Sequence, residues 1–136
     1  MPGSDGPHQL LIDTHVLLWM LTAPDRLSTT IRPILSDRRT QLMVSAASAL
    51  EIATKQRLGK LPQADALVRG YSRHLARLGV STLAISSEHA LHAGGLDWAH
   101  RDPFDRILAA QSMIEALPLV SADAAFASLN GIRVLW

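Results

Sequence analysis

The chain has 136 residues, of which 48% are hydrophobic and 18% charged, and its formal net charge is +1. This composition is typical of one globular domain with a buried core, and it excludes a disordered chain and a uniformly basic nucleic-acid coat. The sequence holds no cysteine, which excludes disulfides, thiolate nucleophiles and cysteine-ligated zinc and suits a reducing compartment, so we expect a cytoplasmic protein.

The N-terminus and the apolar runs refine these expectations. Residues 1–7 contain Pro, Gly and Asp but no Lys or Arg, so we expect a disordered tail and not a signal peptide, followed by a single domain over residues 8–136. The longest run of large apolar residues, Val16 to Leu21, is far too short to span a bilayer.

Short apolar runs alternate along the chain with segments of helical periodicity. In chain order, we expect a strand at 9–13, a helix at 15–22, a helix from Ser28 that Pro33 can kink, a strand at 41–46, a helix at 48–59, a helix at 64–79, a strand at 81–86, a short helix from about Ser87, a helix at 103–117, and strands at 118–123 and 133–136. Strands that alternate with helices predict an α/β fold with a parallel sheet covered on both faces. Such sheets hold their sites at the carboxyl ends of the strands.

Four acidic residues from four separate segments are expected near that edge. Asp13 ends the first strand and Asp123 the fourth, while Glu51 lies one turn into the helix after the second strand and Asp105 begins the helix before the fourth. Clustered carboxylates repel one another, and a hard divalent cation such as Mg²⁺ removes the conflict. Two such ions about 4 Å apart can activate water against a phosphodiester.

Helix capping offers another explanation for three of these acids. In Asp102-Pro103-Phe104-Asp105, Asp102 suits the N-cap and Asp105 the third helical position, so capping alone explains both. Asp123 can cap a short helix, and Glu51 fits a capping box unless its helix begins earlier, at Ser45. Only Asp13 lacks such an explanation, because it interrupts an apolar run where an ionised carboxylate is costly.

Four stretches together resemble a known family. In chain order they are "LLIDTHVLLW", "SAASALEIATKQRLGKL", "HRDPFDRILAAQ" and "LVSADAAF". They are similar to the motif blocks of PIN-domain proteins, and among these to the VapC-type ribonuclease toxins of bacterial toxin–antitoxin pairs. The resemblance implies a PIN-like three-layer fold, with a central, mainly parallel sheet of about five strands flanked by helices.

The resemblance also implies a function and a set of site residues. It implies an endoribonuclease toxin that depends on Mg²⁺, with Mn²⁺ as a substitute, is inhibited by a small VapB-type antitoxin, and forms a homodimer or a higher toxin–antitoxin assembly. The residues carried over by position, as catalytic groups and metal ligands, are Asp13, Glu51, Asp105 and Asp123, with Asp102 left as a cap. Thr14 matches the hydroxyl that orients the first carboxylate, and Ser121 stands where the family often has threonine.

Several residues near these acids are candidates for binding RNA. Trp98 can stack on a base, and Arg101, beside His100, can hold a phosphate, although a packed loop explains Trp98 equally well. Arg106 can contact phosphate or only solvate its helix. Lys55 suits both a phosphate backbone and the negative end of a helix dipole.

Two further readings stay open, and one cluster has a plain explanation. The chain could be a non-catalytic PIN-like module that binds RNA or protein. An aspartate-nucleophile phosphatase is disfavoured because His15 replaces the second acid of its D-x-D motif.

For Glu88, His89 and His92 we expect a solvated helix face and not a metal site.

Overall fold

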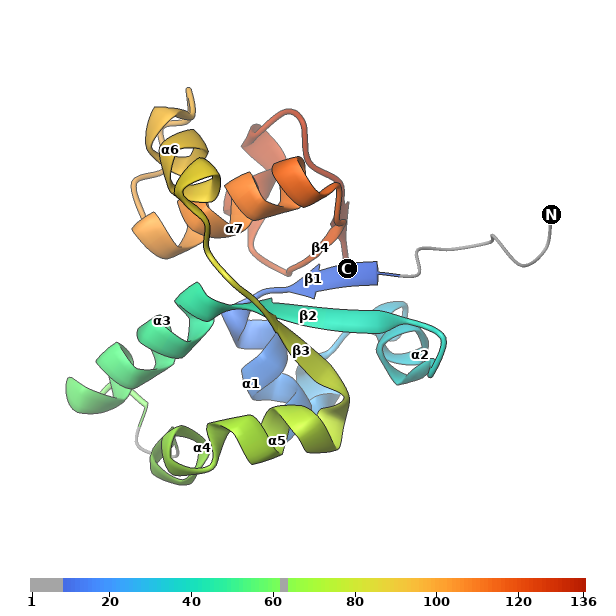
Figure 1. The fold of residues 1–136 in the computed structure, drawn as a ribbon. Coiled ribbons are helices and arrows are strands. Elements are labelled where there is room, and N and C mark those ends of the chain that lie inside the picture. The colour runs from blue at the N-terminus through green and yellow to red at the C-terminus, as the bar shows by residue number, and fades with distance from the viewer. Residues whose placement is uncertain (1–8, 62–63) are drawn as a thin grey trace, which may run out of the picture.

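The computed structural model describes residues 9–61 and 64–136, so the tail predicted at residues 1–7 lies outside the described residues. Within the described ranges, five strands form one sheet in the order β3-β2-β1-β4-β5, and all neighbouring strands are parallel (Figure 1). The strands are β1 (Gln9–Ile12), β2 (Gln41–Ser45), β3 (Val80–Leu83), β4 (Leu119–Val120) and β5 (Val134–Leu135). The predicted α/β fold is therefore confirmed.

Helices connect the strands and cover both faces of the sheet, with α1, α4 and α5 on one side and α6 and α7 on the other (Figure 1). The α-helices are α1 (Thr14–Thr22), α2 (Ile31–Ser36), α3 (Ala46–Arg57), α4 (Asp65–Arg69), α5 (Tyr71–Leu78), α6 (Ser87–Gly95) and α7 (Pro103–Glu115). Two 3₁₀ turns follow α1 and β4, η2 (Pro24–Arg26) and η4 (Ala124–Ser128). No helix in the described part of the chain is long and apolar enough to cross a membrane.

The alternation of side chains along β1 divides the interior into two cores. Leu10 and Ile12 point into the core on the α1 side, where they meet Val16, whereas Leu11 points into the core under α7, where it meets Leu108. The three β1 side chains are completely buried. A central strand of a covered parallel sheet must be apolar on both faces, which is why "QLLI" shows no polar alternation.

Two of the predicted strands extend beyond the observed ones at their carboxyl ends. The predicted strand at 81–86 is too long, because β3 pairs with β2 only as far as Ser45 opposite Leu83. The predicted strand at 118–123 is likewise too long, because the pairing of β1 with β4 ends at Ile12 opposite Val120. The residues after each strand therefore leave the sheet at one common edge.

Two helix predictions differ from the structure. The single helix expected at 64–79 is broken at Gly70, whose φ of −113° and ψ of 24° separate α4 from α5, while Gly79 ends α5 with a left-handed φ of 71° as its position suggested. Pro33 does not kink α2, because it is the third residue of that helix. The N–H that proline lacks would have no helical partner in the first turn.

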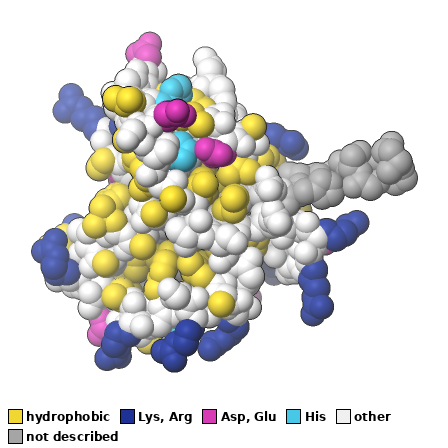
Figure 2. Space-filling model, viewed as in Figure 1, with side chains coloured by type: hydrophobic (Ala, Val, Ile, Leu, Met, Phe, Trp, Pro, Cys, Tyr) yellow, Lys and Arg dark blue, Asp and Glu magenta, His cyan; other side chains and the backbone are white. Residues whose placement is uncertain are grey.

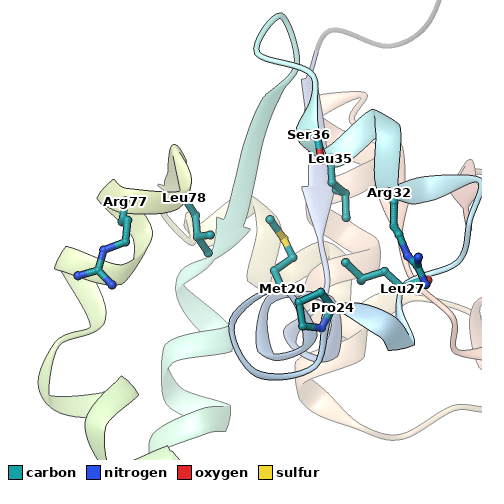
Figure 3. A pocket seen from close by; sticks show the side chains of 8 residues that line it. All are labelled: Met20, Pro24, Leu27, Arg32, Leu35, Ser36, Arg77 and Leu78. Atoms are coloured by element: carbon teal, nitrogen blue, oxygen red, sulfur yellow. The ribbon is translucent and has the colours of Figure 1, made fainter.

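One described hollow, of about 430 Å³, lies between the end of α1, α2 and the end of α5 (Figure 3). Its lining consists of Met20, Pro24, Leu27, Arg32, Leu35, Ser36, Arg77 and Leu78. Two of these side chains are arginines and none is acidic, so this hollow cannot be the predicted carboxylate site.

On the face that carries β3, apolar side chains occupy the centre and Lys and Arg lie around the rim (Figure 2).

The contact of α7 with the sheet predicts a clear difference between two leucines. Leu108 is 1% exposed in the core under α7, so Leu108→Ala should lower the free energy of unfolding by about 2–5 kcal/mol in urea denaturation. Leu91 is 77% exposed on α6, and Leu91→Ala should change the free energy of unfolding by less than about 0.5 kcal/mol. Equal losses would contradict the packing described here.

Candidate active site

Five acidic side chains line one small pocket at the edge of the sheet where the strands end, and four of them are the predicted site acids Asp13, Glu51, Asp105 and Asp123. Asp13 directly follows β1, and Asp123 follows β4, which is parallel to β1. Glu51 comes from α3, which continues directly from β2, and Asp105 comes from the first turn of α7. The structure thus brings together the four acids that the sequence singled out. The same pocket is lined by Thr14, His15, Lys55 and Asp102.

Asp13 is the most constrained of the four. It is only 5% exposed, and its Oδ1 accepts a hydrogen bond of 2.8 Å from the Val16 N–H, which makes it the N-cap of α1. Burial raises the pKa of the Asp13 carboxyl, hydrogen bonds from Ser121 and Val16 oppose that rise, and the negative charge of Asp123 adds to it. The ionised form of Asp13 is therefore kept in the fold at an energetic cost.

Ser121 links the two acids at the strand ends. Its side chain is buried, and its hydroxyl hydrogen-bonds to the Asp13 carboxyl while its Oγ accepts from the Asp123 N–H at 3.0 Å. The Asp123 carboxylate in turn accepts from the Ala125 N–H at 2.9 Å and caps η4, as the capping explanation required. Ser121 thereby sets the position of Asp123 relative to Asp13.

Glu51 is not a capping residue. The helix that carries it begins at Ala46, with Ser45 as the N-cap that accepts from the Ala47 N–H at 3.0 Å. Glu51 therefore lies in the second turn, 5% exposed, and its Oε2 is 2.7 Å from Lys55 Nζ. The sequence predicted that Glu51 would be a capping residue unless its helix began earlier, near Ser45. The helix does begin there, so Glu51 is not used as a cap.

Thr14 connects two of the acidic segments. Its buried hydroxyl donates a hydrogen bond of 2.8 Å to Ser48 Oγ on α3. The family resemblance implied that this hydroxyl orients the Asp13 carboxylate, but in the structure it ties the start of α1 to the turn of α3 before Glu51. Thr14 therefore fixes the spacing between the two segments that carry Asp13 and Glu51.

Asp102 and Asp105 have different partners. Asp102 Oδ1 accepts from the N–H groups of Phe104 and Asp105, at 2.8 and 3.2 Å, so Asp102 is the N-cap of α7 as predicted. The Asp105 carboxylate instead lies 2.7 Å from His100 Nε2. Burial raises the pKa of Asp105, the hydrogen bond from His100 opposes the rise, and the charges of Asp102 and Asp123 add to it. Of the two acids, Asp102 is the helix cap, and Asp105 is the one whose pKa is raised by burial near the other carboxylates.

Within residues 9–61 and 64–136, no three histidine or acidic side chains lie together in positions that could hold a metal ion as they stand. Each of the four carboxylates instead has a polar partner of its own, which is a lysine, a histidine or a backbone N–H. Glu51 faces Lys55, and Asp105 faces His100. The carboxylates share a pocket but are held apart by their own partners.

The sequence pattern of the PIN domain matches residues 10–132. The chain belongs to the PIN-domain family. The match covers all four acids and every described element except β5, so the family resemblance noted in the motifs extends over nearly the whole chain.

One relative of this PIN domain is Ribonuclease VapC16 of Mycobacterium tuberculosis (strain ATCC 25618 / H37Rv). The two sequences are 39% identical over 70 residues, which cover 52% of this chain and 49% of VapC16. The match therefore spans about half the length of that relative.

Solved structures share the fold at low sequence identity. The DNA-bound VapBC of Salmonella typhimurium has a TM-score of 0.66 at 17% identity and covers 93% of this chain and 96% of its own. The promoter-bound VapBC2 of Rickettsia felis has a TM-score of 0.64 at 12% identity, with 93% and 97% covered. A toxin–antitoxin complex from Klebsiella pneumoniae has a TM-score of 0.61 at 16% identity, with 93% and 96% covered. These likenesses confirm the PIN fold.

Arg106 of this PIN domain holds the loop between α6 and α7. Its guanidinium donates four hydrogen bonds of 2.7–2.9 Å, to the carbonyl oxygens of Ala93, Leu96, Trp98 and His100. We therefore withdraw Arg106 as a candidate phosphate contact, because its donors are turned into the loop. Sequence reasoning missed this role, since nothing in the sequence reveals where carbonyl groups converge.

The remaining candidates for RNA binding differ in their surroundings. Trp98 is half-buried, packs on Phe126 with ring centroids 5.7 Å apart, and donates from Nε1 to Ser128 Oγ at 3.1 Å, so the packed-loop explanation holds for it. The His100 ring packs against Trp98 with centroids 4.9 Å apart and planes inclined by 46°, and its Nε2 lies 2.7 Å from the Asp105 carboxylate. Arg101 is exposed beside them and stays a prediction for RNA contact.

The expectation of a solvated face on α6 is wrong for one residue. Glu88 and His92 are exposed, but His89 is 3% exposed. His89 Nδ1 accepts from the Ser86 N–H at 3.0 Å, and its Nε2 lies 2.8 Å from Glu115 on α7. Since Nδ1 is an acceptor, the ring proton sits on Nε2 and is donated to Glu115. The pairing of α6 with α7 explains the burial.

We predict that Arg106→Lys loosens the α6–α7 loop, because lysine keeps the charge but lacks the planar set of donors that reaches four carbonyls. The free energy of unfolding should fall by about 1–3 kcal/mol, and amide hydrogen exchange in residues 96–101 should become faster. Arg101→Lys on the exposed surface is the matched control and should leave both unchanged. Unaltered exchange in Arg106→Lys would refute the assigned role.

A second prediction follows from the raised pKa of Asp13. Above pH 3.8 the unfolded chain loses the Asp13 proton, whereas the folded protein still retains it. The free energy of unfolding therefore falls as the pH rises from 3.8 to the pKa of Asp13 in the folded protein, and it stays lower at higher pH. Asp13→Asn keeps an acceptor for the Val16 N–H but no charge. In the presence of a chelator it should therefore raise the melting temperature at pH 7 and not at pH 3, measured by circular dichroism. A lower melting temperature at pH 7 would contradict the electrostatic argument.

Proposed function

We propose that this PIN domain is a divalent-metal-dependent endoribonuclease toxin of the VapC type. The observation that carries the proposal is the convergence of four carboxylates from four segments on one pocket at the carboxyl ends of the strands. The 39% identity to a protein named Ribonuclease VapC16 supports it over the 70 matched residues.

The donor set of the pocket fits a hard cation. All four acids offer carboxylate oxygens, the ligands that Mg²⁺ and Mn²⁺ prefer. Burial is the main cause of the raised pKa values of Asp13 and Asp105, and the charge of Asp123 adds to both, so ionising these carboxyls in the folded protein costs free energy. A divalent cation would offset that cost, so Asp13, Glu51, Asp105 and Asp123 are the proposed ligands. We propose Mg²⁺, with Mn²⁺ as a substitute.

A bound divalent ion supplies Lewis acidity, which makes water a better nucleophile and offsets the charge of a phosphodiester. The protein's own residues prepare the pocket for it. Ser121 and Thr14 fix the segments that carry Asp13, Asp123 and Glu51. Lys55, 34% exposed in its side chain, and the exposed Arg101 supply positive charge that can contact the RNA backbone.

We also propose a small VapB-type antitoxin as the inhibiting partner and a homodimer as the assembly. The support for the antitoxin is the fold shared with the VapBC proteins of Salmonella typhimurium and Rickettsia felis. Exposed apolar side chains on α3 and at its C-cap, Leu50 at 61% and Leu58 at 53%, suit contact with a protein partner. Light scattering of the chain alone, and after co-expression with a candidate antitoxin, would measure the assembly.

The test of the proposed function is Mn²⁺ binding by calorimetry to the wild type, Asp105→Asn and Asp102→Asn. The wild type and Asp102→Asn should bind, because asparagine is as good an N-cap as aspartate, whereas Asp105→Asn should bind at least about tenfold more weakly. Equal binding by all three would remove Asp105 from the ligand set.

Cleavage distinguishes the ribonuclease from the non-catalytic module. With Mn²⁺, the wild type should cut a pool of single-stranded RNA, and Asp105→Asn should lose at least about a hundredfold of that activity. Asp102→Asn is again the matched control. Mn²⁺ binding without cleavage of any RNA in the pool would favour the non-catalytic PIN-like module.

A further inference from the structure

We infer that a hollow beside the four acids, lined by Asp13, His15, Trp19, Ala122 and Asp123, binds one unpaired nucleobase of an RNA strand. The inference rests on the proposed function, because it takes RNA as the ligand. The hollow is about 240 Å³, which is smaller than the usual site of a drug-sized ligand and suits a single planar ring.

The aromatic wall of the hollow comes from one face of α1. His15 and Trp19 are four residues apart on the helix, and their ring centroids lie 6.0 Å apart with the ring planes inclined by 49°. His15 is exposed, although it directly follows the buried pair Asp13 and Thr14. The exposed imidazole and the half-buried indole line the same hollow and offer it aromatic surface on which a base can stack.

The indole is held in place from its other sides. Trp136, at the end of the chain, lies 5.7 Å from the Trp19 ring, and the Arg26 guanidinium of η2 lies 5.8 Å above its centroid. Packing on the core explains this buried side of Trp19. It does not explain the exposed His15 or the hollow between His15 and the acids. A wall fixed before binding loses little conformational entropy when a base docks.

The hollow is continuous with the acid pocket. Asp13, His15 and Asp123 line both, so a ligand in the hollow lies directly beside the proposed metal ligands. Two carboxylates at its border disfavour an anionic head group, while the aromatic side chains favour a neutral, flat π-system. A base stacked there would therefore belong to a nucleotide next to the phosphodiester held at the acids. Stacking on aromatic side chains tolerates all four bases, so we expect the hollow to position the strand more than to select its sequence.

The first test uses photo-cross-linking and needs no catalysis. A single-stranded RNA 12-mer in which every uridine is 4-thiouridine is irradiated with the wild-type protein in EDTA, and the modified residues are identified by mass spectrometry. We expect cross-links at His15 or Trp19. Cross-links found only elsewhere, or none at all, would overturn the inference.

The second test measures RNA affinity by fluorescence anisotropy in EDTA. His15→Ala and Trp19→Ala should each weaken binding about tenfold, the usual effect of removing one stacking partner, while Trp19→Phe should retain most of it. Trp19→Phe and His15→Ala keep the test valid if Trp19→Ala fails to fold. His92→Ala, an exposed histidine on α6, is the matched control and should bind as the wild type does. Wild-type affinity in both His15→Ala and Trp19→Ala would overturn the inference.

These outcomes separate the inference from the proposed function. Cross-links at His15 or Trp19 without cleavage in Mn²⁺ would support the base site and contradict the nuclease. Cleavage that is normal in His15→Ala and Trp19→Ala, without cross-links on α1, would support the nuclease and contradict the base site.

Discussion

The arrangement of the site depends on the parallel pairing of β1 with a neighbour on each side. Ile12 is opposite Val44 of β2 and opposite Val120 of β4, so all three strands end at one edge. The chain then turns there into α1, into α3 and toward η4, and Asp13, Glu51 and Asp123 lie within or shortly after these three turns. If β4 ran antiparallel to β1, Asp123 would lie at the opposite edge of the sheet and the pocket would lose one of its acids.

Once the acids are at one edge, their mutual repulsion shapes the surrounding contacts. Burial raises the pKa values of Asp13 and Asp105, and each of the four acids has a polar partner. These partners are the Lys55 ammonium, the His100 imidazole and backbone N–H groups at helix starts. Stability and ligand binding therefore compete at this pocket, because the charge that suits a divalent cation is costly without one.

Two walls enclose the acids. On one side, the α6–α7 loop is fixed by the four hydrogen bonds of Arg106, which keep His100 beside Asp105. On the other side, α1 presents His15 and a Trp19 ring that is supported from beneath. One wall orients an acid and the other is the proposed platform for a base, so both edges of the pocket are ordered before any ligand binds.

The sequence by itself determined the α/β class, the parallel sheet, the placement of Asp13 and Asp123 at the edge where the parallel strands end, and Asp102 as the cap of α7, because these depend on local periodicity and on the residues next to each turn. Only the tertiary structure decided the contacts made across elements. β3 and β4 end where their pairing with β2 and β1 ends, α7 buries His89, and converging carbonyl groups accept the hydrogen bonds of Arg106. Such contacts join residues far apart in the chain and leave no periodic trace in the sequence, so they become visible only when the elements are packed together.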